Sequence, residues 1–200
     1  MLVRSGSALV GQAVPSGGGG LPPVAPTGVA ITPPGYPLTA RDIGVAFTSG
    51  TSRYYPMRLD APWTLTDVAI NVNTAAAGST IHVALYRDPT ATVQPGALVS
   101  LVSGAGFSSA TTGAKSASSL GLSLSAGHYV FVVYPQGGSP TLLGYLMATP
   151  FMDGGVNNQI VNRLERSAAT YPLPDPGQAY NGVGTGTTLF PGVLWLKGTA

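Results

Sequence analysis

The 200-residue sequence contains no cysteine. This absence excludes a disulfide framework, a zinc or iron–sulfur site held by thiolates, and a cysteine nucleophile. It does not indicate a compartment, because cytosolic and secreted chains can both lack cysteine.

Charged residues are also scarce. Asp, Glu, Lys and Arg make up 8% of the chain, whereas a typical globular domain carries about 25%. The formal net charge is only +2, and the lysines and arginines form no cluster. Because a surface that follows phosphates needs clustered cations, we expect no nucleic-acid partner.

Long apolar runs are missing as well. The longest core-like run is Tyr129–Tyr134, far shorter than the roughly 18 apolar residues that a membrane helix needs. Residues Met1–Gly6 lack the apolar block of a secretory signal. We expect neither membrane insertion nor export through a signal peptide.

Glycine and proline, by contrast, are abundant, with 28 and 18 copies. Such a proportion approaches that of disordered chains, but 44% of the residues are hydrophobic, which predicts a folded core. Residues 1–40 hold eight glycines, seven prolines and a single charged residue, Arg4. We predict an extended Gly/Pro-rich N-terminal arm or linker over residues 1–40 and one domain over residues 41–200.

Beyond the arm, apolar residues recur at every second position, the period of a half-buried β-strand. Trp63–Asn73 shows this pattern, and so does Ser79–Arg87. In the second segment Ile81, Val83 and Leu85 are predicted to point inward, and His82, Ala84 and Tyr86 outward. The link Thr74–Gly78 is short enough for a hairpin. Further strands are predicted at residues 42–47, 97–103, 116–124, 128–134, 141–147, 158–163 and 193–197.

Helix signals are almost absent from the sequence. The best candidate, Gln159–Arg166, is short, and the neighbouring Gly and Thr residues are poor helix formers. Many short strands rich in Val, Thr and Tyr, separated by turns, are typical of a closed or two-layered β-fold. The sequence therefore predicts an all-β, antiparallel β-sandwich, jelly-roll-like in organisation.

Catalytic groups are few. His82 and His128 are the two histidines, and they fall in separate predicted strands, where ordinary structural roles are favoured. A carboxylate pair for glycoside hydrolysis remains an alternative, because seven acids are present. Asp88, Asp153 and Asp175, however, adjoin proline or glycine, which is typical of turn residues that bond their own backbone. We predict that the protein is not an enzyme.

One segment superficially suggests a metal site. Asp153–Asn158 contains carboxylate and amide oxygens beside two glycines. It lacks the alternating ligands and the closing Glu of a calcium-binding loop, so we expect no metal there. No residues indicate a cofactor either.

Aromatic residues give the positive binding signal. Tyr54, Tyr55, Trp63 and Tyr86 are candidate contacts for a glycan or for another subunit, because flat rings with a polar tip suit both. Tyr134, Tyr171 and Tyr180 belong to the same wider set. A subunit interface is the favoured interpretation, and core burial is the other alternative.

Three segments carry a resemblance to a known group of proteins. They are Ile81–Asp88, which ends a strand in Leu-Tyr, the turn-containing Gln94–Ser100, and Leu124–Phe131 with the pattern Leu-x-x-Gly-x-Tyr-x-Phe. In this order they resemble β-sandwich domains of tailed-phage virion proteins: head-fibre or decoration, tail-fibre and minor tail proteins. The resemblance covers roughly residues 60–135, and its matching positions are turns and core residues.

The resemblance implies a non-enzymatic virion component on the surface of a head or tail, attached to other virion proteins through residues 1–40. A host-surface glycan is a candidate partner. The scarcity of charge fits a subunit packed among copies of itself, and we expect a homo-oligomer, a trimer by analogy with fibres and capsid threefold positions. A carbohydrate-binding β-sandwich module is the first alternative, and a glycan hydrolase is the second.

Overall fold

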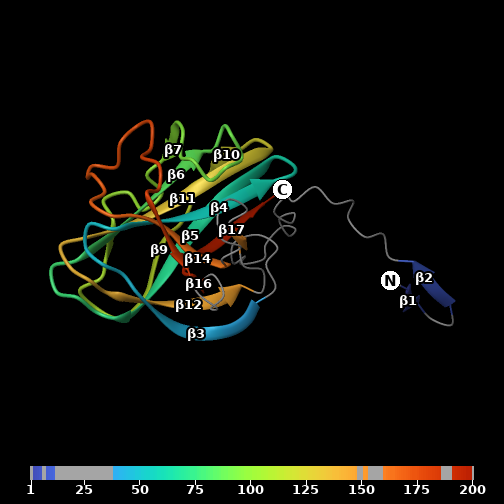
Figure 1. The fold of residues 1–200 in the computed structure, drawn as a ribbon, viewed down its shortest axis with the longest axis horizontal. Coiled ribbons are helices and arrows are strands. Elements are labelled where there is room, and N and C mark those ends of the chain that lie inside the picture. Colours follow the sequence, from blue (N-terminus) through green and yellow to red (C-terminus); the bar gives the residue numbers. More distant parts are fainter. Residues whose placement is uncertain are drawn as a thin grey trace.

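The computed structural model describes residues 2–5, 8–11, 38–147, 151–152, 160–185 and 191–199. Within these ranges every regular element is a β-strand (Figure 1), and no helix suited to crossing a bilayer is present there. The strands form two large antiparallel sheets, consistent with a β-sandwich, and one small hairpin. The predicted all-β class is confirmed.

The first sheet has seven strands. Its longest strand, β5, pairs with four others, β9, β10, β12 and β17, and β12 also pairs with β3 and β16. The bounds are β3 (Leu38–Ala46), β5 (Trp63–Thr74), β9 (Gly113–Ala117), β10 (Leu122–Leu124), β12 (Thr141–Met147), β16 (Pro191–Gly192) and β17 (Trp195–Thr199).

The second sheet has eight strands, with β11 at its centre between β4 and β6. The path runs β13-β14-β4-β11-β6-β7, while β15 pairs with β14 and β8 pairs with β6. The bounds are β4 (Ser52–Leu59), β6 (Thr80–Arg87), β7 (Leu98–Ser100), β8 (Phe107–Ser108), β11 (Gly127–Gln136), β13 (Phe151–Met152), β14 (Ile160–Arg166) and β15 (Gly182–Thr185).

The small hairpin lies within the predicted arm. It joins β1 (Leu2–Ser5) to β2 (Ala8–Gly11), and these two strands pair with each other. Residues 12–37, most of the arm, lie outside the described residues, so the extended arm stays a prediction.

The central strands of the second sheet have two buried faces. Tyr55, Phe131 and Leu85 lie opposite one another across β4, β11 and β6, and so do Tyr54, Val132 and Ala84 one position along. Opposed residues of an antiparallel pair point to the same side, so these two rows lie on opposite faces. Both rows are buried. Besides the core that the two sheets share, something must therefore cover the outer face of this sheet.

Sequence periodicity does not predict β4. Its side chains are buried at nearly every position, so the alternation of a half-buried strand is absent. It also contains Pro56, which usually argues against a central strand. By contrast, β12 occupies Thr141–Met147, as the pattern predicts, and β5, β6 and β11 lie within a few residues of their predicted bounds.

The predicted hairpin between β5 and β6 is wrong. The two strands belong to different sheets, and the link between them crosses from one sheet to the other. Backbone bonds hold this link beside β8: the amide of Ala76 donates to the carbonyl of Ser109, and the amide of Ser109 donates to the carbonyl of Ser79. A short link between two alternating strands fits a hairpin within one sheet and also a crossing between two sheets. In both arrangements each strand buries one face in the same core.

Gly198 gives a direct test of core packing. A Cβ atom at this position would lie 2.3 Å from the Trp63 ring and 2.4 Å from the carbonyl oxygen of Thr64. We expect Gly198→Ala to destabilise the domain by about 1–3 kcal/mol through overpacking, measured by urea unfolding.

Gly182→Ala is the matched control for this measurement. A Cβ there meets Glu165 at an ordinary 3.6 Å, so the change should stay within about 0.5 kcal/mol. Equal stabilities of the two variants would show that Trp63 does not pack against Gly198 as described.

Candidate binding face on the second sheet

A single segment covers the outer face of the second sheet. Residues 167–181 connect β14 to β15, and we call them the covering segment. They include three prolines within five positions, Pro172, Pro174 and Pro176. Proline has a fixed φ and no amide hydrogen, so this sequence favours an extended path over a regular strand. The segment contacts residues of β4, β11 and β6.

At one end of this contact, Tyr171 stacks on two rings of the sheet. Its ring centroid lies 5.7 Å from that of Tyr134, with the planes nearly parallel at 6°, and 4.3 Å from that of His82. His82 also bonds Gln136, since its Nε2 lies 3.0 Å from the amide Oε1. We call His82, Tyr134, Gln136 and Tyr171 the ring cluster.

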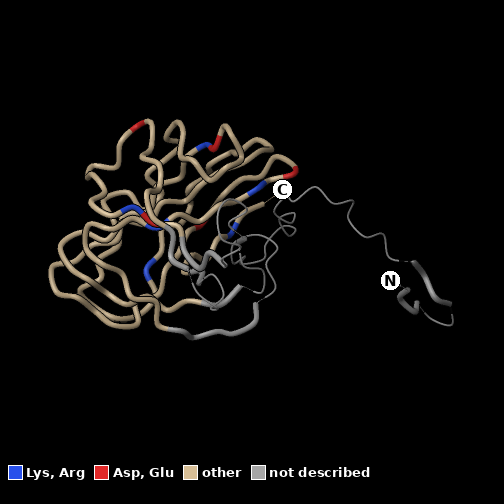
Figure 2. The backbone as a smooth tube through the Cα atoms, in the orientation of Figure 1, with Lys and Arg blue, Asp and Glu red and all other residues tan. Residues whose placement is uncertain are grey.

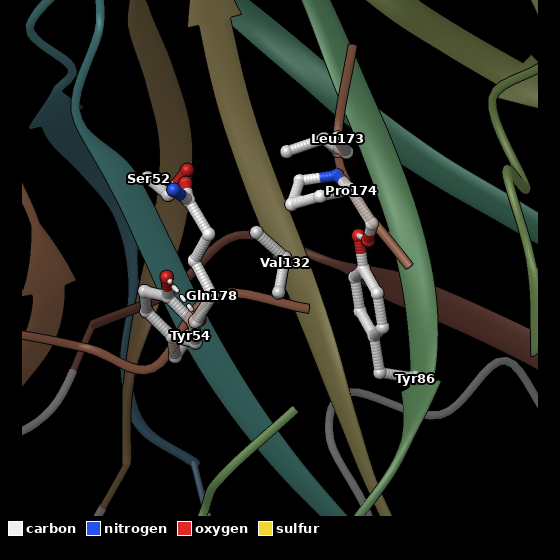
Figure 3. A pocket seen from close by; sticks show the side chains of 7 residues that line it. All are labelled: Ser52, Tyr54, Tyr86, Val132, Leu173, Pro174 and Gln178. Atoms are coloured by element: carbon white, nitrogen blue, oxygen red, sulfur yellow. Dashed lines mark hydrogen bonds between the residues drawn. The ribbon is translucent and has the colours of Figure 1, made fainter. Parts of the chain in front are cut away.

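In the middle, two tyrosine hydroxyls of the sheet hold the covering segment (Figure 3). The Tyr54 hydroxyl donates to the carbonyl oxygen of Gln178, and the Tyr86 hydroxyl donates to that of Pro174, each at 2.9 Å. Each such bond contributes about 1 kcal/mol net, and leaving the buried carbonyl unpaired would cost more. The two bonds fix the segment above β4 and β6.

A small cavity lies between these two anchors, with Val132 of β11 at its centre (Figure 3). The volume of the cavity is about 10 Å³, roughly enough for one water molecule. The buried Ser52 hydroxyl lines this cavity and has no hydrogen-bond partner among the described residues. The space is too small for an organic ligand.

At the far end, the covering segment joins the loop between β6 and β7. The amide of Leu98 donates to Asp175 Oδ1 at 2.8 Å, and the amide of Gly177 donates to the carbonyl of Gly96 at 2.9 Å. A Cβ at Gly177 would lie 2.8 Å from the Tyr86 ring, so this close approach requires glycine. The segment is thus held along its whole length.

Burial under the segment shifts the tyrosine pKa values. Desolvation, together with the charge of Asp175, raises the pKa of Tyr86 to about 12. Desolvation also raises the pKa of Tyr55 to about 12, although Arg53 opposes it, and raises that of Tyr54 against the opposing charge of Arg166. All three hydroxyls therefore stay protonated, and those of Tyr54 and Tyr86 donate to the covering segment.

Burial also acts on His82. Desolvation lowers its pKa from the usual value, and the bond to Gln136 opposes this shift only in part. The imidazole in the ring cluster is therefore neutral near pH 7. Because Gln136 Oε1 can only accept, a neutral His82 carries its proton on Nε2.

The four residues predicted as glycan or interface contacts are all in the core. Tyr54 and Tyr86 are 1% exposed, Tyr55 is 2% exposed and Trp63 is 5% exposed. This burial matches the alternative of core packing, and a role of these four rings in glycan or subunit contact stays a prediction. Tyr86 lies on the outward face that the alternation of β6 indicates, and Tyr54 lies on the same face of the sheet, but the covering segment occupies that face. Tyr55 points to the opposite side, into the core between the sheets.

Among the described rings Tyr171 is exposed, at 41%, while Tyr180 and Trp195 are half-buried. Sequence analysis includes Tyr171 only in the wider aromatic set. A tyrosine directly before Pro172 in a proline-rich stretch is the available signal, because such a stretch cannot fold into a core by itself. Nothing in the sequence indicates that Tyr134 and His82 lie beneath it.

The acids that the structure describes serve local structure. Asp88 Oδ1 accepts from the amide and the hydroxyl of Thr90, and its Oδ2 accepts from the amide of Val93, which confirms the predicted turn role. Asp60 pairs with Arg58 at 2.7 Å. In the ranges given above, no three His, Asp or Glu side chains gather. The calcium-like Asp153–Asn158 lies outside the described residues.

The charged residues are dispersed over the domain. Figure 2 shows lysines, arginines, aspartates and glutamates as short segments of the described chain, some positive ones next to negative ones, with no continuous stretch of one sign. Such a surface creates no extended field to attract a polyanion or a polycation.

The buried tyrosines predict resistance to alkaline titration. Burial keeps the hydroxyls of Tyr54, Tyr55 and Tyr86 protonated above the ordinary tyrosine pKa of about 10 for as long as the chain stays folded. Above that pH the unfolded chain releases phenolic protons that the native state retains, so stability falls as pH rises from about 10 towards 12. The near-ultraviolet absorbance of phenolate, followed with circular dichroism, measures both events. Full ionisation before any loss of structure would contradict the buried anchors.

His82 predicts an acid-side loss of stability. Since its folded pKa lies below the unfolded value of about 6.5, the unfolded chain binds the proton first as pH falls. Stability is fully present above pH about 6.5 and decreases below it, towards the folded pKa.

Melting temperature between pH 7.5 and about 5.5 measures this effect, above the range where carboxylates titrate. His82→Phe keeps an aromatic ring under Tyr171 and should flatten the pH dependence. His128→Gln removes the other histidine and is the control. If His128→Gln flattened the pH dependence of the melting temperature as much as His82→Phe does, the acid-side loss of stability would not come from His82.

Comparisons with known proteins add no assignment to this geometry. No protein-family model matches the sequence, and no curated protein matches it. The function of the domain therefore has to be argued from its own residues.

Proposed function

We propose that this chain is a non-enzymatic structural protein of a tailed-phage or phage-like particle. In this proposal residues 1–40 anchor the chain to other virion proteins. The domain over residues 41–200, a jelly-roll-like sandwich, is displayed on the surface of the head or tail, with host-surface attachment as its role. The proposal starts from the sequence resemblance and is supported by the way the described polar groups are used.

The observation that carries the proposal is that the groups suited to acid–base chemistry are used as structural ties. Asp88 bonds its own loop, Asp175 bonds the amide of Leu98, and His82 is stacked and bonded to Gln136. A catalytic acid or base needs to reach a substrate in a cleft. These three groups instead hold a loop, the covering segment and the ring cluster. That arrangement favours a rigid scaffold over a reaction site.

The surface composition supports a place in an assembly. The edge strand β9 carries one charged residue, Lys115, among small neutral ones, and most of its positions are exposed. Free sheet edges can pair with other chains, and most soluble proteins protect them with charge, proline or bulges. We infer that copies of this chain or neighbouring virion proteins cover such edges, in a homo-oligomer that we take to be a trimer.

A carbohydrate-binding module is the second candidate, and one observation favours it. Tyr171 presents a partly exposed ring on a rigid support, which is the arrangement that sugar recognition by stacking uses. The two candidates are compatible, because a displayed domain can bind a host glycan.

Deletion of residues 1–37 tests the anchoring role. This truncation ends before Leu38, so it keeps β3 and its pairing with β12. We expect the truncated chain to keep the melting temperature of the full chain and to be absent from purified particles that incorporate the full chain. Protein gels and mass spectrometry of the particles measure incorporation.

A matched control replaces residues 1–37 with a Gly-Ser segment of the same length. We expect this variant also to be excluded, since the anchor depends on sequence and not on length alone. Incorporation of the truncated chain at the level of the full chain would refute anchoring by the arm. Failure of the full chain to co-purify with any particle would refute the virion role itself.

A further inference from the structure

We propose that Tyr171 and the ring cluster beneath it form a binding site for one neutral pyranose unit of a surface glycan. The inference deepens the proposed role in host attachment and rests on it for its biological meaning. The site is an aromatic platform: the exposed side of the Tyr171 ring would stack against the C–H face of the sugar.

The Tyr171 ring is exposed on one side and supported on the other. Its side chain has 41% exposure, whereas Tyr134 has 7% and His82 has 4%. The ring centroids of His82 and Tyr134 lie 4.3 Å and 5.7 Å from that of Tyr171, so two buried rings pack against it. The part of the Tyr171 ring that they leave uncovered is open to solvent.

The backbone on either side of Tyr171 is fixed as well. The amide of Ala169 donates to the carbonyl of Gly50 at 2.9 Å, and Thr170 exchanges two bonds with the Gln178 side chain. Pro172 follows the tyrosine and restricts its backbone. Binding to a ring that is already ordered costs little conformational entropy, which favours a weakly binding ligand such as a sugar.

The chemistry around the ring selects a neutral ligand. Gln136, Thr170 and Gln178, the polar groups beside the cluster, carry no charge, and the lowered pKa of His82 keeps it neutral too. Gln136 uses Oε1 to bond His82, so its amide nitrogen retains two hydrogens that this bond does not use. An exposed amide donor beside an aromatic face suits a sugar hydroxyl beside a C–H face.

Electrostatics explains the preference for a pyranose. The face of an aromatic ring is negative and C–H groups are slightly positive, so the apolar face of a sugar is attracted to the ring. An organic cation would need several rings arranged as a cage, and a nucleic acid would need a row of cations beside the ring. The cluster provides one exposed ring and no cation.

The size of the exposed apolar surface argues against a large protein partner at this place. Among the described side chains, Tyr171 and Leu101 are the large hydrophobic ones that remain exposed. A stable protein interface buries about 800 Å² on each partner around a cluster of such anchors. A single supported ring fits one sugar residue better than it fits a protein surface.

The test uses the full chain on a glycan array that carries neutral, sialylated and sulfated glycans. Titration calorimetry with the best neutral oligosaccharide on the array follows. We expect neutral glycans to bind, and Tyr171→Ala to weaken binding about tenfold, the order of an aromatic stacking contact. Tyr171→Phe should retain most of the affinity, because it keeps the ring.

Leu101→Ala is the matched control, since it removes the other exposed large hydrophobic residue, and we expect it to leave glycan affinity unchanged. Circular dichroism of each variant shows whether the covering segment stays in place. If Tyr171→Ala unfolds, Tyr171→Phe and Tyr171→Trp still test the ring. Both variants keep an aromatic ring, so we expect both to bind the glycan. Free sugar added as a competitor should abolish this binding.

Several outcomes would overturn the inference. They are binding of no glycan on the array, binding of sulfated or sialylated glycans only, and equal affinity of Tyr171→Ala and the unaltered chain. Concentration-dependent self-association that Tyr171→Ala abolishes would assign the ring to contact with a second copy instead. Incorporation into particles is measured separately from glycan binding. A failure to bind glycans therefore does not refute the virion role, and a failure to enter particles does not refute glycan binding.

Discussion

The rest of the structure depends on one constraint: the central strands of the second sheet bury both of their faces. Strands β4, β11 and β6 pack one face into the core between the sheets, and their other face carries tyrosines, valines and a histidine that also need cover. A second sheet can cover only one side. The covering segment supplies the other cover, and it does so with discrete bonds to Tyr54 and Tyr86 instead of with another sheet.

Cover of the sheet by the covering segment explains why the candidate binding site lies at Tyr171. A proline-rich segment has little apolar surface of its own, so it must take its order from the sheet beneath it. Leu173 is the buried side chain of the segment, while Tyr171 is its large exposed one. At Tyr171 the segment reaches the edge of the aromatic face, so the ring is supported from below and open above. Rigidity and exposure coincide at that residue, and we base the glycan inference on this coincidence.

The low charge of the chain has a structural counterpart. The acids and histidines of a globular domain usually maintain solubility or perform chemistry, but here several of them hold loops together. Asp88 orders the loop after β6, and Asp175 ties the covering segment to Leu98. The rest of the described surface carries scattered charges, such as Arg58, Asp60 and Lys197, among neutral residues. Such a surface suits permanent neighbours and neutral ligands, which is the common ground between the two functions proposed.

The sequence by itself determined the all-β class, the positions of β5, β6, β11 and β12, and the division of β6 into two faces. Period-two alternation is a local property, so it can be read without knowing the fold. Only the tertiary structure decided which faces meet water. A strand with both faces buried, such as β4, loses the alternation that would reveal it. The outward face of β6 became a second core because a segment nearly ninety residues later in the chain, at Pro174, lies on it. A local pattern cannot show a contact between residues so far apart in the chain. Tyr86 therefore looks outward-facing in the sequence, and the rings that pack against Tyr171 become apparent only in the folded chain.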